Sequence, residues 1–214
     1  MPNCRPAACI LLLALIPGIA CSETAVEGRV ELPKPTILSV VNKRYQVVTK
    51  GGETTINPPQ GVVYLDGNFA KPAVQPVIQM VQKNLAFTTP LLPVQVGTKV
   101  EFPNHDDAFH NIFSFSPTKR FDLGRYRPEE RPIPSQVFET PGSVILRCDI
   151  HEHMRGLILV LETPHFTTTK TDGTYRLTGR PAGRYKLKAW VTSTKLLERM
   201  VDLKAGSTLK VDFP

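Results

Sequence analysis

One short segment of the chain collects side chains that bind soft metal ions. Cys148, His151 and Met154 lie within seven residues of one another. A thiolate, an imidazole and a thioether together suit copper, and they suit zinc to a lesser degree. Two histidines and a cysteine in a plane, with a weak axial methionine, form the ligand set of blue copper sites. We therefore expect Cys148, His151 and Met154 to share one metal ion.

The planar set needs a second imidazole, and His110 can supply it. His110 follows the strand-like stretch 99–102, so it can sit on a loop at the same end of a β-sandwich. His153 lies inside the Cys148 segment and is an alternative to Met154 for the axial position. The expected cofactor is copper, as Cu⁺ or Cu²⁺, and zinc stays open as the alternative.

The N-terminal segment predicts export. Residues 1–20 carry Arg5, no acidic residue, an apolar run at 10–16 and small residues at the end, which is the pattern of a secretory signal peptide. A periplasmic or extracellular location follows. A lipid on Cys21 would attach the protein to a membrane, and otherwise no membrane contact is expected. Cys148 is the one cysteine inside the mature folded chain.

Composition indicates a globular all-β protein. The chain has 214 residues, 41% of them hydrophobic, with 20 Pro and 14 Gly. Its net charge of +7 comes from scattered Lys and Arg, so no nucleic-acid partner is expected. Five His are too few for multicopper chemistry. The acid pairs at 106–107 and 129–130 are expected on solvent-facing loops, so we expect no enzyme activity.

Two strands must position the sulfur donor. In the stretch 144–148, Val144, Leu146 and Cys148 share one face, which places the cysteine at the end of a buried strand. The continuous apolar run 157–161 predicts a second buried strand. A short turn between them would bring His151 back toward Cys148.

These motifs resemble the cupredoxin family, which includes plastocyanin, amicyanin, pseudoazurin and azurin. The similar stretches are 94–104, the pair His110-Asn111, and Cys148-x2-His151-x2-Met154, whose spacing is similar to that of amicyanin. The likeness covers residues 77–161. It implies a cupredoxin Greek-key sandwich, a type 1 copper site and one-electron transfer.

The family also implies residues next to the ligands. Asn111 corresponds to an Asn that ties the ligand loops together. Asp149 stands where Ser, Thr or Asn is common, and we expect it to accept a hydrogen bond from Asn111 and to add negative charge near the metal. The stretch 121–126 loosely resembles bacterial copper proteins of the methylamine-utilization type.

The flanking segments resemble transthyretin-like, carboxypeptidase-regulatory modules. The stretches that carry this likeness are 28–30, 63–67, 171–177 and 181–189. We expect residues 27–72 and 162–214 to form a second small transthyretin-like β-sandwich, with the copper domain of residues 77–161 inserted between its two parts.

Three functions are open from the sequence. The first is one-electron transfer to a redox protein, such as a cytochrome or a periplasmic oxidoreductase, with an acidic surface that suits the basic chain. His151 would face this partner, with Phe109 and Ile150 as neighbours. The second function is copper transport or sequestration. The third is a glycan- or protein-binding β-module in which copper is secondary.

Overall fold

The computed structural model describes residues 24–34, 59–67, 69–70, 72–192 and 195–214. The expected signal peptide and Cys21 lie outside these residues. Within them every regular element is a β-strand, and no helix is long and apolar enough to cross a membrane. The all-β class predicted from the sequence is confirmed.

Seventeen strands make up the described fold. They are β1 (Ala25–Arg29), β2 (Val62–Asp66), β3 (Val77–Gln79), β4 (Gln82–Lys83), β5 (Ala86–Phe87), β6 (Leu91–Gln95), β7 (Thr98–Glu101), β8 (His110–Ser116), β9 (Lys119–Tyr126), β10 (Ser135–Phe138), β11 (Gly142–Arg147), β12 (Arg155–Leu161), β13 (Phe166–Thr168), β14 (Thr174–Thr178), β15 (Gly183–Trp190), β16 (Leu196–Leu203) and β17 (Thr208–Lys210).

Strands β3 to β12 form the first sandwich. One sheet has the order β10-β7-β3, the other has the order β6-β12-β11-β8-β9, and β4 and β5 make a small hairpin. Alternating side chains of the two sheets meet in one core, which contains Val100, Phe138, Ile112, Leu146 and Ile158. Burial of such apolar surface is the main force that holds two sheets face to face.

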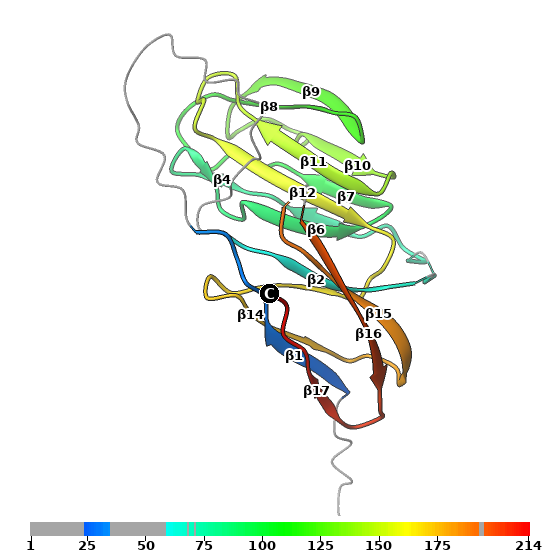
Figure 1. Cartoon of the computed structure of the whole chain (residues 1–214). Helices are drawn as coiled ribbons and strands as arrows, with labels where there is room; N and C mark the ends of the chain where they lie inside the picture. Colours follow the sequence, from blue (N-terminus) through cyan, green and yellow to red (C-terminus); the bar gives the residue numbers. More distant parts are fainter. Residues whose placement is uncertain (1–23, 35–58, 68, 71, 193–194) are drawn as a thin grey trace, which may run out of the picture.

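The remaining strands form the second sandwich. Its sheets have the orders β14-β1-β17 and β13-β2-β15-β16, so strands before and after the first sandwich share both sheets. Val26, Leu65, Leu177 and Leu187 lie in its core. In Figure 1 the first sandwich, green to yellow, lies above the second.

Strand β12 explains how the two sandwiches are joined. Ile158 and Val160 point into the core of the first sandwich, while Leu157, Leu159 and Leu161 point the opposite way. The outward-pointing leucines pack against residues of the second sandwich, so both faces of β12 are buried. This double burial is why the segment is a continuous apolar run rather than an alternating one.

Candidate metal centre

Three donor side chains converge at one end of the first sandwich. His110 opens β8, Cys148 directly follows β11, and His151 lies between β11 and β12. Cys148 Sγ lies 3.9 Å from His110 Nδ1 and 3.8 Å from His151 Nδ1. The two Nδ1 atoms are 3.1 Å apart. Among the described residues, this is the one group of three or more His, Cys, Asp or Glu side chains placed to hold a metal ion.

The sheet topology brings these donors together. Because β8 and β11 are antiparallel neighbours, the start of β8 lies beside the end of β11, and His110 lies beside Cys148. After Cys148 the chain turns sharply, and the Met154 backbone N–H donates to the His151 carbonyl oxygen at 2.8 Å. Strand β12 then runs back antiparallel to β11. The turn therefore places His151 back at the cysteine.

Burial separates the inner donors from the outer one. The exposed fractions are 0% for His110, 4% for Cys148 and 1% for Met154, whereas His151 is partly exposed. Met154 packs in the same core cluster as Cys148. Cys148 is a free cysteine, so its sulfur is available as a ligand. His151 is thus the donor that reaches the surface.

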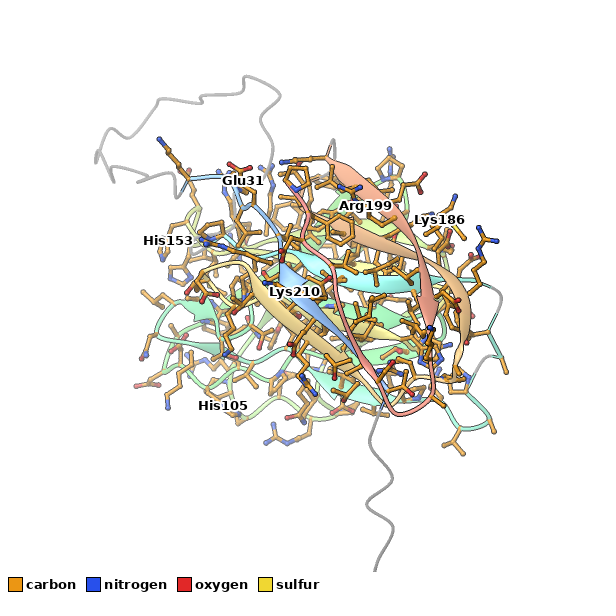
Figure 2. The ribbon with its side chains drawn as sticks, turned by 60° about the horizontal axis from the view of Figure 1, so that its bottom comes forward. Glu31, His105, His153, Lys186, Arg199 and Lys210 are labelled. Carbon is orange, nitrogen blue, oxygen red and sulfur yellow. The ribbon has the colours of Figure 1, made fainter. Side chains whose placement is uncertain are left out.

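Three other histidines lie outside the donor group, and two of them, His153 and His105, are close to a donor in the sequence. His153 is exposed, and its ring centroid lies 6.1 Å from that of His151. His105 is also exposed, and Figure 2 shows the two residues well apart from each other. The axial position therefore has a buried candidate, Met154, and an exposed one, His153.

An aspartate that the sequence did not single out contacts the donor group. Asp106 Oδ2 lies 2.9 Å from His110 Nε2, and the Asp106 side chain is only 11% exposed. The expectation of a solvent-facing acid pair is wrong for Asp106, because its carboxylate turns inward to this imidazole. Asp107 is exposed, as expected. The four-residue spacing from Asp106 to His110 was the available signal, but spacing alone does not indicate the direction of a loop side chain.

Charge and burial shift the pKa values at this site. Burial lowers the pKa of His151, and the neighbouring His110 and His153 lower it further. Neutral imidazole, the form that binds metals, is therefore favoured at His151. Burial raises the pKa of Asp106, but the hydrogen bonds from His110, Leu85 and Asn84 outweigh it, so the net pKa lies below its usual value.

The prediction that Asn111 donates a hydrogen bond to Asp149 is wrong. Asn111 Nδ2 instead donates to Asp122 Oδ1 at 2.7 Å. Asp149 Oδ2 accepts from Arg125 Nη2 at 2.9 Å and from Arg125 Nε at 3.1 Å. The reason is a competing partner: Arg125, the cross-strand neighbour of Asn111, takes the Asp149 carboxylate, while the Asn111 amide is held by Asp122. The Arg125 cation also offsets the negative charge that Asp149 brings near the site.

The donor atoms fit a metal ion. Metal–nitrogen and metal–sulfur bonds of about 2.1 and 2.3 Å that meet at about 120° place nitrogen and sulfur about 3.8 Å apart. The Sγ–Nδ1 distances are 3.9 Å to His110 and 3.8 Å to His151. The two Nδ1 atoms are closer than the roughly 3.6 Å that the same bonds would give. A thiolate with two imidazoles, together with a thioether buried in the same core cluster, suits copper best among the common metals.

A small hollow opens directly beside His151. It has a volume of about 520 Å³ and is lined by Ala108, Phe109, Arg125, Ile150 and His151. Phe109 is 43% exposed and Ile150 is 39% exposed. Arg127 lies over the Phe109 ring, 4.5 Å from its centroid. The exposed side of the donor group is therefore an apolar surface with cations at its rim.

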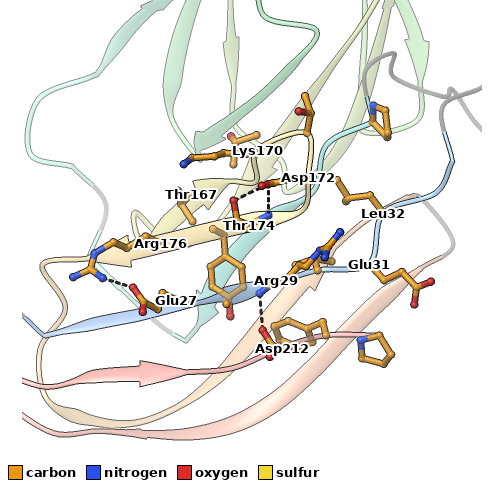
Figure 3. Close-up of a pocket in the computed structure, with 18 of the residues that line it drawn as sticks. Glu27, Arg29, Glu31, Leu32, Thr167, Lys170, Asp172, Thr174, Arg176 and Asp212 are labelled. Carbon is orange, nitrogen blue, oxygen red and sulfur yellow. Dashed lines mark hydrogen bonds and ion pairs between the residues drawn. The ribbon is translucent and has the colours of Figure 1, made fainter.

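A larger hollow of about 1370 Å³ lies on the second sandwich and shares no residue with the donor group. Figure 3 shows charged side chains around it, some of which are paired. Arg176 pairs with Glu27, and the Arg29 backbone N–H donates to Asp212. Because these groups are largely exposed to solvent, the hollow has less to offer a ligand than the donor group does.

The chain matches no protein-family model and no curated protein. It is similar to solved structures of two amicyanin variants, one in the Cu(I) form and one oxidised. They are 22% and 23% identical to this chain, and each has a TM-score of 0.37. Each match covers 46% of this chain and 98% of the amicyanin chain. A purple cupredoxin from Nitrosopumilus maritimus is 24% identical, and its match covers 39% of this chain and 98% of the cupredoxin chain, with a TM-score of 0.34.

The predicted resemblance to cupredoxins is confirmed. At these TM-scores the geometry of the donor atoms, rather than the likeness, supports a metal centre in this chain.

Proposed function

We propose that this protein is an exported copper protein that carries single electrons. The observation that carries the proposal is the convergence of Cys148 Sγ with His110 Nδ1 and His151 Nδ1, at 3.9 and 3.8 Å. A copper ion bound there supplies a one-electron redox couple. In this proposal His110, Cys148 and His151 hold the ion, and Met154 is the axial ligand because it is buried in the same core as the cysteine.

The protein around the donors favours electron transfer over ligand exchange. His110 begins a strand of a sheet and Cys148 directly follows another strand of it, so neither backbone moves freely. A rigid ligand set needs little rearrangement when the charge on the ion changes. His151 reaches the surface beside the exposed Phe109 and Ile150. An electron would enter and leave through this edge.

We propose a redox protein with an acidic docking surface as the partner, such as a cytochrome or a periplasmic oxidoreductase. Arg125 and Arg127 lie next to the apolar surface around Phe109. Complementary charge raises the rate of encounter and sets the docking orientation. This interaction should weaken as salt screens the charges.

A copper carrier is the second candidate. The exposed His153, with its ring next to His151, favours it because an accessible donor beside a bound ion can assist ligand exchange. The buried positions of His110, Cys148 and Met154 argue for a retained ion instead.

The test is copper reconstitution of the purified mature protein. We expect an intense blue thiolate-to-Cu²⁺ absorption band and a reversible one-electron wave in voltammetry. Cys148→Ser should abolish the band, and His105→Gln, which changes an exposed histidine outside the group, should leave it unchanged. A colourless protein that binds only Cu⁺ would support the carrier, and a protein that binds no copper would contradict both functions.

A further inference from the structure

The carboxylate of Asp106 receives three hydrogen bonds and links a turn to the donor group. Its Oδ1 accepts from the Asn84 backbone N–H at 2.5 Å, and its Oδ2 accepts from the Leu85 backbone N–H at 2.9 Å. The same Oδ2 lies 2.9 Å from His110 Nε2. Asp106 therefore lies between the β4–β5 hairpin and His110.

The hairpin turn is shaped to hold this carboxylate. Asn84 and Leu85 have φ values of 58° and 56°, in the left-handed region. Two such residues in succession form the tight turn of a two-residue hairpin. For a leucine this conformation is unusual. It aims two adjacent N–H groups at Asp106, so the turn fixes the position of the anion.

The base of the hairpin is anchored as well. Gln82 is fully buried, and its Nε2 donates to the Tyr126 hydroxyl oxygen at 2.6 Å and to the Phe102 carbonyl oxygen at 3.1 Å. The Tyr126 hydroxyl donates to the same carbonyl at 3.0 Å. These buried bonds join the hairpin to β9 and to the end of β7, so it forms a rigid support for Asp106.

The hydrogen-bond roles then follow from the chemistry of the groups. A backbone N–H can only donate, so both Asp106 oxygens already act as acceptors. The remaining partner, His110 Nε2, must supply its own hydrogen. A neutral imidazole with hydrogen on Nε2 has a lone pair on Nδ1, which is the atom that faces Cys148 and His151.

We propose that Asp106 is the positioning residue of the metal centre: its carboxylate holds His110 in the Nε2–H tautomer, with Nδ1 directed at the ion. The part of this proposal that concerns a bound copper ion rests on the proposed function. The arrangement is a carboxylate–histidine–metal relay, in which the carboxylate makes the imidazole a stronger donor. Its negative charge favours the more positive oxidised ion over the reduced one.

The first test needs neither a metal nor a substitution. Long-range ¹H–¹⁵N NMR of the metal-free wild-type protein reports which ring nitrogen of His110 carries hydrogen. We expect hydrogen on Nε2 and none on Nδ1. Hydrogen on Nδ1, or an even mixture of tautomers, would overturn the proposal.

The second test compares Asp106→Asn with Asp107→Asn, which removes the same charge from an exposed neighbour. Loss of such an outer partner lowers metal affinity by about 10- to 100-fold. We expect that loss of copper affinity and a raised reduction potential for Asp106→Asn, and neither change for Asp107→Asn. If both variants fold and have the same copper affinity and reduction potential, the proposal is overturned. If the wild type bound no copper, the proposed function would fail, while the tautomer of His110 would still decide the role of Asp106.

Discussion

The residue that serves as the axial ligand affects how strongly the site favours Cu²⁺ over Cu⁺. Met154 is 1% exposed and shares a core with Cys148, whereas His153 is exposed next to His151. A sulfur ligand donates electron density to Cu²⁺ more than to Cu⁺. The identity of the axial ligand therefore affects the reduction potential.

We predict that Met154→Leu raises the reduction potential and retains the fold. Leucine fills a similar volume, so the free energy of unfolding should fall by less than about 1.5 kcal/mol. Voltammetry and urea unfolding measure the two quantities. His153→Gln is the control and should leave the potential unchanged. The opposite pattern would make His153 the axial ligand.

Donor residues were predictable from sequence, but their supporting contacts were not. Cys148 and His151 stand out because soft donors at short spacing are rare by chance, and the structure brings both to His110. Asp106 did not stand out, because its role depends on a hairpin turn 21 and 22 residues earlier in the chain. Asp149 was given the wrong hydrogen-bond partner, because Arg125 reaches it from β9, which lies beyond β8 in the sheet.

At the scale of elements, the inner face of β12 packs closely against the core of the first sandwich. A Cβ atom on Gly156 would lie 2.7 Å from Met80 Cε and 2.9 Å from Phe87 Cδ2. Both neighbours are buried in the first core. The sequence predicted a buried strand from its apolar run, but an apolar run does not indicate which partners cover the two faces of the strand.

We predict that Gly156→Ala lowers the free energy of unfolding by about 1–3 kcal/mol, the usual cost of overpacking a core. Urea unfolding at an unchanged m-value measures it. The loss should be smaller when Phe87→Leu is already present, because the shortened side chain leaves room for the methyl group. An equal loss in both backgrounds would show that the contact with Phe87 is not the cause.

At the scale of the whole molecule, an apolar interface joins the two sandwiches. Leu157, Leu159 and Leu161 of the first sandwich cluster with Val62 and Trp190 of the second. Such an interface should make the two sandwiches unfold together, in contrast to domains joined by a polar contact. The first sandwich, and the donor group in it, would then depend on the second for stability.

The two connections between the sandwiches also contact each other. Gln95 Nε2 donates to the Ala70 carbonyl oxygen at 3.2 Å and to the Glu162 carbonyl oxygen at 3.3 Å. Phe69 and His165 meet edge to face, with ring centroids 4.4 Å apart. The family resemblances placed the connections near these positions, but contacts between residues so distant in the chain depend on the packed fold.

Trp190 provides a direct probe of this interface, because the sequence contains one Trp and it packs there. We predict that Trp190 fluorescence and far-UV circular dichroism report a single, coincident urea transition of the metal-free protein. Leu159→Ala should shift both signals together and lower the free energy of unfolding by about 2–5 kcal/mol, the usual cost of truncating a buried leucine. Val74→Ala, at a position 80% exposed, should change it by less than about 0.5 kcal/mol. A fluorescence transition that moved without the dichroism would mean that the sandwiches unfold separately, and that the interface does not stabilise the donor group.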